Sequence, residues 1–234
     1  MPTICSRQAR AKVMRLTLLD ECGAVVEGPA STLVTDGFVS VTSTPNYLDA
    51  EEITQANANG DLCIDDRSDP ALRWIDLSII VCITDPQMIN LITGDPLVVD
   101  DASPTPNTVG FRINAALTGT ANFALEIWEG ITGQGCTAGG FTNYGYWLYP
   151  WVKDAQWGEW VHQNGALVLT FTARAVNDSQ WGVGPYDVRR DAAVPATLEP
   201  LLTAIDDDDF VHYEISSAPL PTSACGAVAL DLTP

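Results

Sequence analysis

The segment Leu72–Gly94 constrains the fold more than any other part of this chain. Its first half, Leu72–Ile83, is rich in β-branched and apolar residues and contains no glycine or proline, which predicts a long, largely buried strand. Asp85 is a good N-cap, Pro86 suits the first helical position, and Gly94 suits the residue after the last turn. We therefore predict one strand that runs into one short helix, whose apolar side lies on a sheet.

Further strands are predicted along the rest of the chain, and no other stretch indicates a helix as strongly. They are expected at Lys12–Leu19, Gly37–Thr42, Gly110–Leu117, Asn122–Trp128, Ala166–Arg174 and Phe210–Ile215. Turn signals separate them, without a fixed-period repeat or a domain linker. We predict a single mainly β domain over residues 1–234, a β-sandwich or partial barrel with one short α-helix. An N-terminal arm is expected at about residues 1–15 and a C-terminal extension at about 216–234.

A long polar segment, Ser43–Asp69, separates two of the predicted strands. Asn59-Gly60 within it is a strong hairpin turn signal. We predict a hairpin or extended loop that projects from the domain. Loops of this length usually make contacts, so the segment is expected to bind something.

The charge of the chain is strongly negative, with 30 acidic and 11 basic residues and a net charge of −19. Such a surface repels nucleic acid instead of binding it through its phosphates. Solubility is the simpler explanation of this charge, and both remain open. Four basic residues precede the first carboxylate, Asp20. This cationic start is expected to pair with an acidic surface, on the same chain or on a neighbouring copy. No stretch approaches the roughly 20 apolar residues that span a bilayer.

The sequence does not predict catalytic, cofactor or metal chemistry. Its two histidines, His162 and His212, lie in no nucleophile or metal motif. The six cysteines are scattered without a C-x-x-C pair, so free thiols are expected and a zinc site is not. The run Asp206–Asp209 lacks the spacing of a calcium loop and is expected to be solvated. We therefore predict that the protein is not an enzyme.

The segment Phe141–Trp160 is intensely aromatic. Such a band forms core or a subunit interface in many proteins, and in carbohydrate-binding β-sandwiches it stacks on sugars. A secreted or surface module that binds carbohydrate through this segment is therefore the alternative to a structural role. As candidates for a subunit interface we take Tyr146, Trp147, Tyr149 and Trp151.

Several short segments, in a fixed order, together resemble the major tail proteins of long-tailed, non-contractile bacteriophages, particularly those that infect actinobacteria. The similarity runs from about Leu16 to about Glu214. The segments are Leu16–Gly23, Asp36–Val41, Glu51–Gly60, Asp85–Gly94, Gly110–Arg112, Phe123–Trp128 and Trp181–Tyr186.

This resemblance implies a structural virion protein with a fold like the tube proteins of other phages and of type VI secretion. Its subunits would form hexameric rings that stack into a tail tube. Genomic DNA would cross the negatively charged lumen without specific binding during ejection. The tape measure protein and the tail terminator and baseplate proteins would be partners. The virion tail, assembled in the host cytoplasm, would be its location.

The resemblance defines no contact residue, so the candidates are placed by position and charge. The inter-ring contact candidates are Arg7, Arg10, Lys12, Asp49, Glu51 and Glu52. The candidates for an acidic lumen or surface are Glu126, Asp206, Asp207, Asp208 and Asp209.

Overall fold

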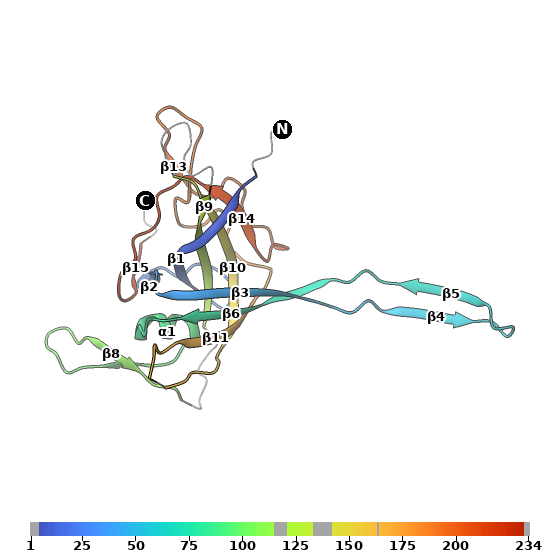
Figure 1. Cartoon of the computed structure of the whole chain (residues 1–234), viewed down its shortest axis with the longest axis horizontal. Coiled ribbons are helices and arrows are strands. Elements are labelled where there is room, and N and C mark those ends of the chain that lie inside the picture. The colour runs from blue at the N-terminus through green and yellow to red at the C-terminus, as the bar shows by residue number, and fades with distance from the viewer. Residues whose placement is uncertain (1–4, 115–120, 133–141, 163, 232–234) are drawn as a thin grey trace.

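The computed structural model describes residues 5–114, 121–132, 142–162 and 164–231. Within these residues the fold is mainly β with one short helix, as the sequence predicts. Its centre is a nine-stranded antiparallel sheet in the order β15-β2-β1-β9-β10-β11-β6-β3, with β14 also paired to β10 (Figure 1). The strands are β1 (Arg7–Leu19), β2 (Gly28–Thr35), β3 (Phe38–Tyr47), β6 (Leu72–Val81), β9 (Asn122–Thr132), β10 (Tyr144–Trp157), β11 (Leu169–Ala175), β14 (His212–Ser216) and β15 (Val228–Leu230).

Three two-stranded sheets lie outside this main sheet. They are β4 (Glu52–Ala56) with β5 (Leu62–Arg67), β7 (Leu97–Val99) with β8 (Thr108–Phe111), and β12 (Arg189–Arg190) with β13 (Leu198–Glu199). The β4–β5 hairpin extends furthest from the body, and the β7–β8 hairpin projects on the opposite side (Figure 1).

The segment Leu72–Gly94 folds as predicted. The strand β6 buries alternate residues from Ile75 to Val81 and leads into α1 (Pro86–Thr93). The Asp85 carboxylate accepts hydrogen bonds from the first backbone N–H groups of α1, and Gly94 ends the helix in the left-handed conformation at φ 78°. Four apolar side chains of α1 are buried against the sheet, namely Met88, Ile89, Leu91 and Ile92.

The hydrophobic core lies on both faces of the sheet, because β9 is buried on both sides. On one face Phe123, Leu125 and Ile127 pack in a core that also contains α1. On the other face Ala124 and Trp128 pack in a second core with residues of the 181–205 segment. The sandwich or partial barrel is thus one curved sheet that α1 covers on one face and long loops cover on the other.

The structure corrects both predicted terminal extensions. From Arg7 onward the expected N-terminal arm is the strand β1, which pairs with β9 along its length. The expected C-terminal extension folds back, because β15 pairs with β2 and forms one end of the sheet. The backbone N–H groups of Gly226 and Ala227 also donate to Asp85 and Gln87 beside α1. Both errors have the same reason: the partner strands lie far away in the sequence.

Replacing Asp85 by Ala should lower the free energy of unfolding by about 2 kcal/mol. The carboxylate accepts from Gln87 N at 2.9 Å and from Gly226 N at 2.6 Å, so its loss uncaps α1 and releases the C-terminal segment. The variant Asp101→Ala, at an exposed loop carboxylate, is the control and should change stability by less than about 0.5 kcal/mol. Urea denaturation measures both, and equal midpoints for the two variants would contradict this role of Asp85.

Candidate functional site

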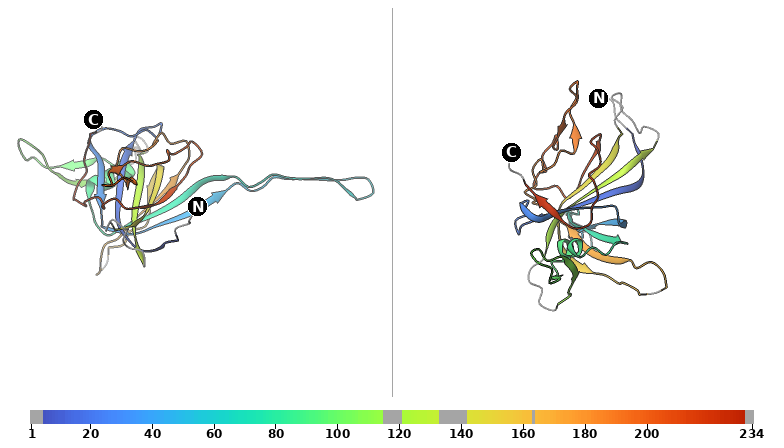
Figure 2. Two further views of the ribbon diagram at one scale, coloured as in Figure 1. Left: turned by 90° about the horizontal axis from the view of Figure 1, so that it is seen from above. Right: turned by 90° about the vertical axis from the view of Figure 1, so that its left-hand side faces the viewer.

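A two-stranded arm, residues 48–71, projects from the body as a continuation of β3 and β6 (Figure 1, Figure 2). The β4–β5 ladder runs from Glu52–Arg67 to Ala56–Leu62 and closes in a turn at Asn57–Gly60. The Asn57 side chain accepts from the N–H groups of two turn residues. Every residue from 51 to 71 is exposed. The prediction of a projecting hairpin is confirmed, except that Ser43–Tyr47 belongs to β3.

The arm carries exposed apolar side chains on both of its faces. The register of the ladder places Ile53 and Ile64 on one face, 52% and 49% exposed, and a register shift places Leu62, 60% exposed, opposite Ala56 on the other. An isolated two-stranded hairpin is at best marginally stable in water, and it needs further packing to be well ordered. The arm therefore has the composition of a segment that binds another surface.

The arm is also strongly acidic. Between Asp49 and Asp69 it contains seven carboxylates and only one basic residue, Arg67. The predicted contact residues Asp49, Glu51 and Glu52 lie at its base and on β4, and all three are exposed. Their contact with another ring remains a prediction.

The three basic inter-ring candidates lie together at the N-terminal end of β1. Arg7, Arg10 and Lys12 belong to an unbroken run of six exposed residues, Arg7–Lys12. This end of β1 pairs only with β9, because the ladder with β2 begins at Met14. We refer to residues 7–12 as the cationic strand end.

The structure overturns the assignment of Glu126 to an acidic lumen or surface. Glu126 is 0% exposed, and both of its carboxylate oxygens accept hydrogen bonds from the Arg15 guanidinium. The Tyr146 hydroxyl donates to the same carboxylate at 2.8 Å, and the Arg15 guanidinium lies 3.3 Å from the centre of the Tyr186 ring. This buried group joins β1, β9 and β10 across the second core.

The electrostatics of this group reflect its burial. Burial by itself lowers the pKa of Arg15, but the adjacent Glu126 carboxylate outweighs it and leaves this pKa raised. Burial, followed by the negative charge of Glu126, raises the pKa of Tyr146 well above its usual value. Tyr146 therefore remains a neutral donor. The sequence analysis did not predict the Arg15–Glu126 pair. The sequence does contain a signal for it, because Glu126 lies in the middle of a strand that is apolar on both faces.

The structure corrects two of the four residues of the predicted aromatic interface. Tyr146 and Tyr149 are 0% and 6% exposed and lie in the two cores, so neither reaches a second chain. Trp147 and Trp151 are half-buried, and their ring N–H groups donate to Glu129 and to Asn122 within the chain. A subunit contact of Trp147 and Trp151 stays a prediction.

The carbohydrate alternative gains no support from the positions of these rings. Trp157 stacks on Phe111 and contacts Phe171 and Trp160, so its neighbours occupy the surfaces that a sugar would need. Trp160 is 40% exposed at the end of this cluster. Sugar binding by this segment stays a prediction.

The acidic run Asp206–Asp209 lies in a surface turn. Asp206, Asp207 and Asp208 are exposed, and Asp209 is half-buried with its carboxylate accepting from the Asp206 N–H at 2.9 Å. They therefore remain candidates for an acidic surface. In the described ranges, no group of three or more His, Cys, Asp or Glu side chains is placed to hold a metal ion. The described cysteines are free and exposed, namely Cys5, Cys22, Cys63, Cys82 and Cys225.

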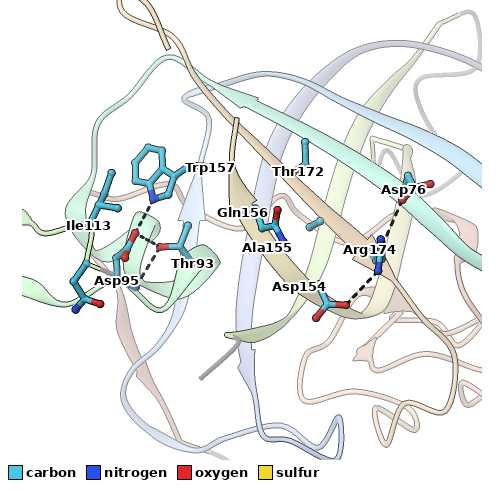
Figure 3. Close-up of a pocket in the computed structure, with 12 residues that line it drawn as sticks. Asp76, Thr93, Asp95, Ile113, Asp154, Ala155, Gln156, Trp157, Thr172 and Arg174 are labelled. Carbon is cyan, nitrogen blue, oxygen red and sulfur yellow. Dashed lines mark hydrogen bonds and ion pairs between the residues drawn. The ribbon is translucent and has the colours of Figure 1, made fainter. Parts of the chain in front are cut away.

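One cavity of about 520 Å³ lies beside the irregular part of the β10–β11 ladder (Figure 3). Its charged groups are paired with neighbours. The Trp157 ring N–H donates to Asp95 at 2.6 Å, and Arg174 lies 3.8 Å from both Asp76 and Asp154. The cavity indicates no particular ligand.

No protein-family model matches this sequence, and no curated protein matches it. Over the part of the chain that the structure describes, no helix is long and apolar enough to cross a membrane.

Proposed function

We propose that this protein is a structural subunit of a phage tail tube, which assembles with copies of itself into stacked rings. The observation that carries the proposal is the arm, residues 48–71. Every residue from 51 to 71 is exposed, including Ile53 and Ile64 on one face and Leu62 on the other. A hairpin of this kind gains stability only when it packs against another surface. Repeated copies of the chain provide that surface in a regular assembly.

The sheet supports the same proposal. Among the described residues its last strand, β3, has a strand neighbour only on the β6 side, and most of its own residues are exposed. Exposed sheet edges promote association, and joining them around a ring removes them. An obligate ring contact of this type buries about 2,000 Å² or more. A hexameric ring, and contacts with tape measure, terminator and baseplate proteins in the virion, follow from the family resemblance.

The charge of the chain suits a conduit for DNA. Duplex DNA carries about one negative charge per 1.7 Å of its axis, so a basic wall would hold it along its whole length. A lumen lined by carboxylates leaves the DNA free to slide during ejection. The net charge of −19 provides the carboxylates, and exposed residues such as Asp206, Asp207 and Asp208 are available for this lining.

Electron microscopy of the purified protein tests the proposal. At concentrations from about 1 µM to 1 mM and near-physiological salt, we expect rings or tubes with a central channel, formed in a concentration-dependent way. Sedimentation velocity measures the same transition in solution. A protein that remains monomeric over this whole range, with or without glycan binding, would contradict the proposal.

A further inference from the structure

We infer that the arm of one copy docks on the cationic strand end, residues 7–12, of a second copy, and that opposite charges align the two. The inference rests on the proposed self-assembly and adds where the arm binds. The partner is a second copy of this chain, and the docking surface lies on its β1.

The first observation is that Arg7, Arg10 and Lys12 form no ion pair with the described residues of a chain rich in carboxylates. Residues 7–15 contain four of the eleven basic residues of the sequence. Three other cations form ion pairs within the chain, namely Arg15 with Glu126, Arg174 with Asp76 and Asp154, and Arg189 with Glu199. Among the described residues no ion pair involves Arg7, Arg10 or Lys12. With 30 acidic residues available, a shortage of carboxylates is not the reason.

The second observation is that this surface is open on one side. On the N-terminal side of Met14, β1 has no described strand partner on the β2 side. On the β9 side the carboxylate of Glu129 lies opposite Ala11 and accepts a hydrogen bond from Trp147. No ion pair within the described residues joins Glu129 to a cation of the strand end.

The mode of docking follows from the local backbone. The ladder of β1 with β9 is interrupted between Ala9 and Ala11 and again between Ala11 and Val13, and Arg10 has a φ of 62°. Bulges and left-handed residues disrupt a strand edge and prevent regular addition of another strand. A partner therefore contacts the strand end through its charged side chains. It does not add to the sheet as a further hydrogen-bonded strand.

The third observation is the complementary charge of the arm. Its net charge of −6 between Asp49 and Asp69 would be repelled by most of this acidic protein. The arm points away from its own body, so its partner belongs to another molecule (Figure 2). Several exposed ion pairs, each weak, can select one docking register because every other register places like charges together.

A charge-swap experiment tests the inference. The strand variant carries Arg7→Glu and Lys12→Glu, the arm variant carries Glu52→Lys and Asp65→Lys, and a third protein carries all four changes. We expect each pair alone to raise the concentration needed for assembly by at least about tenfold. The four changes together should return it to within about threefold of the unaltered protein, because opposite charges face each other again. Sedimentation velocity and electron microscopy measure assembly.

The control variant, Arg73→Glu with Arg112→Glu, makes the same change of charge at two exposed cations away from β1. It should assemble within about threefold of the unaltered protein. Circular dichroism verifies folding, and the milder pair Arg7→Gln and Lys12→Gln replaces the strand variant if that variant unfolds.

The outcomes separate this inference from the proposed function. If the strand variant assembles like the unaltered protein, or if the four changes fail to restore assembly, the docking inference is overturned while the tube proposal stands. If the unaltered protein never assembles, the proposed function itself is overturned, and the docking of one copy on another with it.

Discussion

Replacing residues 49–70 by the two-residue turn Asn-Gly should produce a folded monomer that no longer forms rings or tubes. The cut joins Leu48 to Ala71, whose backbones are already paired by a hydrogen bond of 2.8 Å, and Asn-Gly is a favoured two-residue hairpin turn. We expect assembly to weaken by more than a hundredfold, since losing about 3 kcal/mol of contact energy has that effect. Sedimentation velocity at a series of concentrations measures it.

The stability of this armless protein distinguishes a lost contact from a damaged fold. Because the removed residues are exposed, the free energy of unfolding should change by less than about 1 kcal/mol. The control replaces residues 101–106 of the β7–β8 loop by the same turn, between Asp100 and Asn107, which are also hydrogen-bonded at 2.9 Å. The free energy of unfolding of this control measures how much stability is lost when a loop is replaced by Asn-Gly. An armless protein that assembles normally would show that the arm is not a contact.

Replacing Glu126 by Ala should lower the free energy of unfolding by about 3–5 kcal/mol. The substitution leaves the Arg15 guanidinium charged and buried without its carboxylate, and it removes the acceptor of the Tyr146 hydroxyl. Urea denaturation followed by tryptophan fluorescence measures the loss. The comparison variant is Glu129→Ala, which removes a half-buried carboxylate with one hydrogen bond, to Trp147, and should cost only about 1 kcal/mol.

A double variant tests whether the buried charge is the cause. Arg15→Met combined with Glu126→Leu removes both charges and fills the space, so it should be more stable than Glu126→Ala by at least about 2 kcal/mol. If the double variant were less stable than Glu126→Ala, the loss of stability in Glu126→Ala would come from changed packing and not from an unpaired charge. A loss below about 1 kcal/mol for Glu126→Ala would contradict the burial of the pair.

The parts of the fold that the sequence predicts well depend on local signals. The strand and helix within Leu72–Gly94 follow from composition and from caps that act within a few residues. The arm follows from a turn signal at Asn59-Gly60 and a long polar segment around it. In each case the deciding contacts join residues close together in the chain, and these are the contacts that a sequence displays.

The parts that the sequence does not predict depend on distant partners. Glu126 is buried because it faces Arg15, 111 residues earlier, across a ladder that no local pattern specifies. Tyr146 and Tyr149 are core residues because segments from elsewhere cover both faces of β10. The cationic start is a strand because β9 lies beside it. A charged or aromatic residue in the sequence thus predicts that its side chain needs a contact. The tertiary structure determines which residue provides that contact.

A reconstruction of the assembled protein by electron microscopy is the most direct test of the tube. The proposal predicts stacked rings around an open channel, with carboxylates along its wall, Glu126 inside the subunit core, and each arm seated against a neighbouring copy. A wall lined by lysine and arginine, or particles without a channel, would contradict it.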